Sequence, residues 1–265
     1  MTGPIFDTHA HYSARAFDAD RFALLDSLPE KGVVGVCEQA THSGDAPRVL
    51  ELAHRYPWVY AAIGIHPESL LAPEDCGEEG PAPTVSVFGG DWAAEMKALA
   101  PCYDDPKVVA VGECGLDYHW PVPKDAQLAL FEAEIRLALE LDKPIIVHDR
   151  NAHADVYALL KKYRPKGIVH CYSGSAARQG LYFGFGGACT FKGAKRAAKA
   201  IAALPLEQIV LETDCPYMAP EPVRGIRCDS SLIRYVGEYA ASVKGISPEE
   251  VFRQTAQNAR TVYQL

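Results

Sequence analysis

The sequence predicts an α/β fold, and within that class a closed (β/α)8 TIM barrel. Short runs of apolar and β-branched residues alternate along the chain with longer segments of helical periodicity. Eight such units predict eight parallel strands, which close into a barrel. The alternative is an open, doubly wound sheet. The absence of a G-x-G-x-x-G turn after the first strand makes this alternative less favoured.

Each element has its own signal in the apolar pattern. Helix 124–141 has the clearest one, with apolar side chains at helical spacing from Leu128 to Leu139. Strands are expected at 5–9, 33–37, 59–65, 108–112, 145–147, 168–169, 182–187 and 209–211. Helices are expected at 21–29, 46–56, 92–99, 124–141, 154–163, 175–179, 194–204, 232–243 and 248–262.

One stretch breaks the alternation of strands and helices. Residues 71–90 hold four acids and three prolines and show no periodicity. This composition predicts a surface loop inserted into a single domain that spans 1–265. The loop is interpreted as an inert insertion, with a lid over the strand ends as the alternative.

Composition limits the classes of function. The 265 residues carry a formal net charge of −8, which disfavours a protein that coats duplex DNA through a basic surface. No apolar run reaches the roughly 20 residues that a membrane span needs, and the first residues do not resemble a secretory signal. We therefore expect a cytoplasmic protein, monomeric by default. Its eight cysteines form no C-x-x-C pair and are expected to be reduced thiols.

Metal-binding side chains occur where the predicted strands end. In a β/α barrel the carboxyl ends of all strands meet at one face, so residues far apart in the sequence converge there. A single histidine at a strand end is more often structural, but five of the nine histidines share this position. The full set of candidates is His9, His11, His66, Glu113, His148, His170 and Asp214.

The spacing of His9 and His11 carries a second argument. Residues i and i+2 of an extended segment point the same way, so both imidazoles can bind one ion. Imidazole and carboxylate ligands suit zinc, manganese, iron or nickel and, with more carboxylate and water, magnesium. The six candidates other than His66 are enough for two divalent ions that share a bridging carboxylate, an arrangement that hydrolyses phosphoesters.

The chain resembles the TatD family of metal-dependent hydrolases, within the amidohydrolase-like barrels. The matching segments follow one another in family order and cover nearly the whole chain. They are 6–11 (FDTHAH), 63–67 (IGIHP), 111–118 (VGECGLDY), 144–150 (PIIVHDR), 170–174 (HCYSG), 211–217 (LETDCPY), 220–227 (PEPVRGIR) and 258–260 (NAR). The chain departs from the commonest family pattern at 228–231, where Cys-Asp-Ser-Ser replaces Asn, an acid or Ser, and Pro.

The resemblance implies a role for each candidate ligand. His9 and His11 bind the first ion, and Glu113 bridges both ions. The second ion is held by His148 and His170. Asp214 ligates the first ion and orients or deprotonates the attacking water. Cys114, Cys171 and Cys215 each follow one of these residues, and we interpret them as buried thiols because adjacent strand residues face opposite ways.

The resemblance also implies contacts with the substrate. His66 is expected near the substrate as a phosphate contact or proton donor, with a structural role ahead of Pro67 as the alternative. Arginine forks match phosphate geometry, so exposed cations are candidates for phosphate binding. These cations are Arg150, Lys192, Arg224 and Arg227.

The expected function is hydrolysis of phosphodiester bonds. The resemblance implies a deoxyribonuclease that acts on single strands or 3′ ends, as a 3′-5′ exonuclease, with nucleic acid as its partner. Asp214, Glu113 and His66 are the expected catalytic residues. One alternative is a small-molecule amidohydrolase that acts on an amide, lactone or phosphotriester. The other is a non-catalytic metal-binding barrel.

Overall fold

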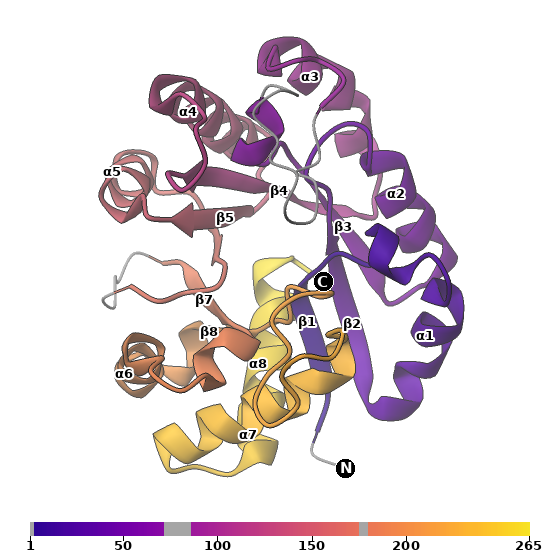
Figure 1. Ribbon diagram of the computed structural model, residues 1–265, viewed down its shortest axis with the longest axis vertical. Coiled ribbons are helices and arrows are strands. Elements are labelled where there is room, and N and C mark those ends of the chain that lie inside the picture. Colours follow the sequence, from indigo (N-terminus) through magenta and orange to yellow (C-terminus); the bar gives the residue numbers. More distant parts are fainter. Residues whose placement is uncertain (1–2, 72–85, 175–179) are drawn as a thin grey trace.

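The computed structural model describes residues 3–71, 86–174 and 180–265. Its eight strands form one sheet in chain order, and each neighbouring pair is parallel. Figure 1 shows the strands around a common centre with the helices outside them. The strands are β1 Ile5–Ala10, β2 Val33–Gln39, β3 Val59–Ile63, β4 Val108–Asp117, β5 Ile145–Arg150, β6 Gly167–Val169, β7 Tyr182–Phe185 and β8 Ile209–Leu211.

In the described residues an α-helix lies between each pair of successive strands except β6 and β7, and α7 and α8 follow one another after β8. The α-helices are α1 Arg21–Ser27, α2 Ala46–Arg55, α3 Trp92–Leu99, α4 Lys124–Glu140, α5 His153–Tyr163, α6 Lys195–Ala203, α7 Ile233–Lys244 and α8 Pro248–Val262. Short 3-10 helices lie at η1 Arg15–Phe17, η2 Pro29–Lys31, η3 Pro67–Leu70, η5 Ala100–Asp104, η6 Gly187–Thr190, η7 Leu206–Gln208 and η8 Ser230–Leu232.

The sheet closes between β1 and the segment that follows β8. The backbone N–H of Asp214 donates to the carbonyl of His9 at 2.9 Å, and that of His11 donates to Cys215 at 3.0 Å. A parallel bridge pairs Ala10 with Cys215. These contacts confirm the predicted closed barrel over the open sheet, because they bring the first and last strands of the sheet together.

Two layers of apolar side chains hold the barrel together. Because side chains alternate between the faces of a strand, one set fills the interior and the other packs under the helices. Helix α8 contributes to the interior set, and Tyr263 just beyond it donates from its hydroxyl to the Thr8 carbonyl at 2.7 Å. The interior set is Phe6, Cys37, Ala62, Val109, Ala110, Ile146, Ile168, Val210, Ala256, Ala259, Val262 and Tyr263.

The turn between α7 and α8 shows how local sequence sets element ends. Helix α7 ends at Gly245, whose φ of 68° places it in the left-handed region that glycine adopts most easily. Helix α8 begins after Ser247, whose hydroxyl accepts from the backbone N–H of Glu250, with Pro248 in the first turn. This turn directs α8 across β1 and β8.

The strands that carry candidate ligands are longer than the apolar pattern predicts. Strand β4 was expected to end at Gly112 but pairs with β5 as far as Asp117 opposite Arg150. Strand β5 likewise continues beyond Val147, so Glu113 and His148 lie inside strands and not beyond them. Their burial explains the difference, since polar side chains that find partners inside the barrel let the ladder continue.

Two predicted segments cannot be compared with the structure. Most of the expected loop at 71–90 falls on 72–85, and the expected helix at 175–179 falls entirely outside the described residues. Among the helices in the described part of the chain, none is long and apolar enough to cross a bilayer.

Candidate metal centre

Four side chains direct one atom each to a common position at the centre of the barrel. His9 Nε2 lies 3.1 Å from His11 Nε2 and 3.2 Å from Glu113 Oε2. His11 Nε2 lies 3.3 Å from Asp214 Oδ1 and 3.5 Å from Glu113 Oε2. Ligands bonded at about 2.0–2.1 Å to one tetrahedral ion lie roughly 3.3 Å apart. These separations therefore match the donor atoms of one coordination shell.

The second oxygen of Glu113 faces a different group of nitrogens. Glu113 Oε1 lies 3.2 Å from His148 Nδ1 and 3.9 Å from His170 Nε2. His66 Nε2 is 3.7 Å from the same oxygen. The carboxylate thus stands between two sets of imidazoles, the position that a bridging ligand occupies.

The histidine His148 is held on its far side by Asp117, a residue that the sequence reasoning did not single out. The carboxylate Oδ2 of Asp117 lies 2.9 Å from His148 Nε2, and its Oδ1 accepts from the backbone N–H of His119 at 2.9 Å. A carboxylate on the other ring nitrogen of a metal-binding histidine fixes the ring and its tautomer. Asp117 lies four residues after Glu113 on β4, which is the signal that could have indicated it.

A second carboxylate, Glu212, lies beside His170. Glu212 Oε1 is 3.1 Å from His170 Nδ1, a close charge pair that is not aligned as a hydrogen bond. The same oxygen accepts from the backbone N–H of Cys171 at 2.6 Å. Glu212 lies two residues before Asp214, a spacing that could have indicated a common face. Both imidazoles opposite Glu113 therefore have an acid behind them.

Asp7 fixes the strand that carries the two histidines. Its carboxylate is fully buried and accepts four hydrogen bonds, from the N–H groups of His9 and Thr213 and from the hydroxyls of Thr213 and Ser230. Burial outweighs these bonds and raises the pKa of Asp7 to about 7. The contacts link β1 with the segment that bears Asp214.

The surrounding groups keep Glu113 ionised. Burial alone raises the pKa of its carboxyl, but electrostatic interactions with His9 and His66 and hydrogen bonds with His11 and His148 outweigh burial and hold that pKa well below its usual range. Burial likewise opposes ionisation of Asp214, and its hydrogen bond with His11 lowers its pKa. An ionised carboxylate is the form that binds a metal.

His148 and His170, which face the other oxygen of Glu113, bind protons more tightly than a free imidazole does. Although burial opposes the charged form, hydrogen bonds with Asp117 and Glu113 raise the pKa of His148 to about 10. Burial is likewise outweighed at His170, where the charge of Glu212 raises the pKa to about 9. A divalent ion must displace such protons, so this donor set of imidazole nitrogens and carboxylate oxygens fits zinc or manganese.

Comparison with known proteins places the chain in a family. The sequence profile of the family described as TatD related DNase matches residues 6–264. The chain belongs to the TatD family. It is thus a metal-dependent hydrolase that acts on ester bonds. The predicted resemblance is confirmed.

Individual relatives agree with this assignment. The chain is 35% identical over 271 residues to the metal-dependent hydrolase YabD of Bacillus subtilis, covering 98% of this chain and 99% of that protein. It is 28% identical over 277 residues to the 3′-5′ ssDNA/RNA exonuclease TatD of Salmonella typhimurium, covering 98% and 99%. The crystal structure of YJJV, a TatD homologue from Escherichia coli, matches with a TM-score of 0.83 and 28% identity over 100% of both chains.

In this TatD-family barrel, His66 is a buried residue with one nitrogen already engaged. Its Nδ1 accepts from the backbone N–H of Glu68 at 3.2 Å, where His66 caps the short helix η3. Burial lowers the pKa of His66 to about 3. The neutral ring therefore carries its proton on Nε2, the atom that faces Glu113.

The predicted phosphate-binding cations differ in how far other side chains engage them. Arg150 is exposed, with Nη1 3.9 Å from Asp117, and Lys192 is exposed as well. The guanidinium of Arg224 lies 4.0 Å above the Phe191 ring. Arg227 is fully engaged, because both of its terminal nitrogens donate to the carboxylate of Asp20, at 2.8 and 2.6 Å.

The cysteines beside the ligands are free thiols. Cys114 and Cys215 are buried, and Cys171 is partly buried. The thiol of Cys114 donates to the Ile146 carbonyl at 3.3 Å, away from the imidazoles. Burial raises the pKa of each of these thiols well above its usual range, which disfavours the thiolate that a metal needs.

Proposed function

We propose that the chain hydrolyses phosphodiester bonds of single-stranded nucleic acid at a centre of two divalent ions, in the manner of a 3′-5′ exonuclease. The observation that carries this proposal is the position of the Glu113 carboxylate between two groups of histidines. One of its oxygens faces His9 and His11, and the other faces His148. The family and the exonuclease named above supply the substrate class.

In the proposed centre each side chain has a distinct task. His9, His11 and Asp214 would hold one ion, His148 and His170 would hold the other, and Glu113 would be shared between them. Zinc, manganese or magnesium would supply an acidified water there and would neutralise charge on the phosphoryl group. Asp117 and Glu212 keep the rings of His148 and His170 in place from behind.

Asp214 is the carboxylate that we propose to accept the proton of the attacking water. Its side chain is 18% exposed, whereas that of Glu113 is 5% exposed. Water and substrate therefore reach Asp214 from the mouth of the barrel. Its lowered pKa keeps it in the form that can take a proton.

His66 is proposed to donate a hydrogen bond to the substrate phosphate. The contact between its Nδ1 and the Glu68 N–H leaves the proton on Nε2, which faces the cluster. A neutral donor positions and polarises a phosphate oxygen without needing to transfer a proton. Arg150, Lys192 and Arg224 remain proposed phosphate contacts, whereas Arg227 first has to leave Asp20.

All candidate ligands come from one barrel, so we propose that 1–265 acts as a single domain. The amidohydrolase and non-catalytic alternatives are not favoured, because the family match spans 6–264 and the full ligand set is present. The predicted monomer and cytoplasmic location stay as proposals.

The test uses the purified full chain and two single substitutions. Bound metal is measured first, and single-stranded DNA labelled at either end is then digested with magnesium or manganese. We expect nucleotides to be released from the 3′ end, and Asp214→Asn to reduce kcat at least a hundredfold. The matched control is Asp142→Asn, whose exposed carboxylate pairs with Lys166 at 2.6 Å near the opposite end of the barrel.

Two results contradict the proposal. If DNA stays intact while an amide or lactone is hydrolysed, the substrate class is wrong. If Asp214→Asn cleaves DNA as fast as Asp142→Asn does, the assigned role of Asp214 is wrong.

A further inference from the structure

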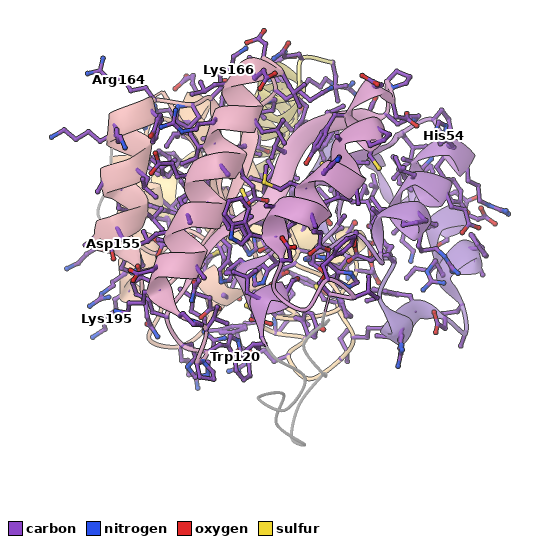
Figure 2. All side chains as sticks on the ribbon, turned by 90° about the horizontal axis from the view of Figure 1, so that it is seen from above. His54, Trp120, Asp155, Arg164, Lys166 and Lys195 are labelled. Carbon is purple, nitrogen blue, oxygen red and sulfur yellow. The ribbon has the colours of Figure 1, made fainter. Side chains whose placement is uncertain are left out.

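Three side chains from different loops lie at the mouth of the metal centre. Glu68 belongs to η3 after β3, Trp120 to the loop after β4, and Tyr217 to the segment after β8. Figure 2 shows Trp120 at the same end of the barrel as Asp155 and Lys195. That end holds the first turns of α5 and α6, and so the carboxyl ends of the strands.

Glu68 is held in place from two directions. Its Oε1 accepts a hydrogen bond from the indole Nε1 of Trp120 at 2.6 Å. Its backbone N–H donates to His66, whose other nitrogen faces Glu113. The loop that carries Trp120 is itself tied to Asp117 through the His119 N–H. One oxygen of Glu68 is thus used, and the residues that the structure describes give no hydrogen bond to the other.

Tyr217 offers an exposed ring beside the candidate ligand Asp214. The residue is 45% exposed, unusual for an aromatic side chain so near a buried cluster. Its backbone N–H donates to the Asp214 carbonyl at 3.0 Å, which places it directly beside a candidate ligand. Burial of its hydroxyl raises the pKa of Tyr217; the charge of His11 lowers that pKa, and the charges of Asp214 and Glu68 raise it further.

We propose that Tyr217 and Glu68 form a subsite for the base of the nucleotide that is cleaved. Tyr217 stacks on the base, and the Glu68 oxygen that Trp120 does not engage accepts a hydrogen bond from the edge of the base. Trp120 keeps the carboxylate turned toward the base. This inference rests on the proposed nuclease function and adds base recognition to it. An exposed aromatic ring next to a charged acceptor suits a base, which has an apolar face and a polar edge.

The acceptor predicts which bases are favoured. A carboxylate accepts from exocyclic amino groups, such as N4 of cytosine and N6 of adenine. Thymine has no amino group there, and its single ring N–H lies between two carbonyl oxygens that a carboxylate repels. Oligonucleotides that end in cytosine or adenine are therefore expected to be cleaved faster than those that end in thymine.

The substitution Glu68→Gln gives a sharp test because it replaces the hydrogen-bond acceptor that faces the base with a donor. The amide oxygen of glutamine can still accept from the Trp120 indole, which leaves its NH2 group facing the base. That group donates to a carbonyl oxygen, so the preference is expected to shift toward thymine. The matched control is Glu140→Gln, an exposed residue at the end of α4.

Stacking is tested with Tyr217→Leu and Tyr217→Phe. The leucine variant loses the ring and is expected to raise KM about tenfold, whereas phenylalanine keeps the ring and the KM. The substrates are oligonucleotides that differ only in the terminal nucleotide. Binding of the same oligonucleotides, followed by quenching of tryptophan fluorescence with calcium in place of the active metal, gives a readout that does not depend on cleavage.

The outcomes separate the subsite from the nuclease function. Cleavage with the same base preference in Glu68→Gln and in Glu140→Gln overturns the subsite and leaves the nuclease proposal standing. Binding that depends on Tyr217 and on the base, without any cleavage, supports the subsite and overturns the nuclease proposal. Absence of both binding and cleavage overturns the two together.

Discussion

Asp7 and Thr213 are joined by two hydrogen bonds, although 206 positions separate them in the chain. Asp7 Oδ1 accepts from the Thr213 N–H at 3.0 Å, and Oδ2 accepts from the hydroxyl at 2.6 Å. The pair sits where the barrel closes, with His9 two residues after Asp7 and Asp214 next to Thr213. The stability of the fold and the geometry of the first ion site therefore depend on the same contact.

Thr213→Val is expected to destabilise the protein by about 1–3 kcal/mol, because a buried carboxylate loses a donor that nothing replaces. Urea unfolding at pH 7 measures the loss. Thr261→Val serves as the control, since that hydroxyl is exposed on α8 and donates only within the helix. Equal stability of the two variants contradicts a supporting role for the pair.

Glu38 makes stability depend on pH in a defined direction. Burial raises the pKa of this carboxyl to about 7, against about 4.5 when exposed, while its oxygens accept from the N–H groups of Tyr12 and Ser13. The folded state thus binds the proton more tightly, so this contribution is present at low pH and is lost as pH rises from about 4.5 through 7.

The matching variant is Glu38→Gln, which carries no charge at any pH. Relative to the native chain, its stability is expected to increase as pH rises from 5 to 8, by up to about 3 kcal/mol, since one pKa unit corresponds to about 1.4 kcal/mol. Chemical unfolding across this range measures the difference. The exposed Glu30→Gln should follow the native curve throughout, and a Glu38→Gln curve parallel to it contradicts the assigned pKa.

Asp117→Asn is expected to weaken one ion site selectively. Loss of the charge behind His148 Nε2 frees the ring, and such a change lowers metal affinity about 10–100-fold. Titration with manganese or zinc, with total metal counted, should show the weaker ion released and the other retained. Asp142→Asn again gives the control, and equal weakening of both ions contradicts a role confined to His148.

The sequence predicts the barrel and the clustering of ligands because both follow from strand periodicity and topology. His9 and His11 converge since i and i+2 share a face, and Glu113 joins them because every strand ends at one face of the barrel. These relations follow from the period of two along a strand and from strand order, so the pattern of apolar runs is sufficient to predict them.

The supporting acids could not be predicted in the same way. The role of Asp117 depends on its contact with Nε2 of His148. That contact depends in turn on the orientation of the imidazole ring and on the continuation of β4 past its apolar run. Arg227 likewise looks like a phosphate ligand in the sequence, but its fork is bound by Asp20, 207 positions away. Long-range pairing between polar side chains has no periodic signal.

Glu113→Ala is expected to lose both ions, and His148→Ala only one. Among the described residues, Glu113 alone directs a carboxylate oxygen to each group of imidazoles. Its Oε2 lies 3.2 Å from His9 Nε2, and its Oε1 lies 3.2 Å from His148 Nδ1. Removing it leaves each half of the centre without its shared negative ligand. Metal content after gel filtration, at equal folded fraction by circular dichroism, measures the result. Two ions retained in Glu113→Ala would exclude a bridge, and one ion retained would assign Glu113 to a single site.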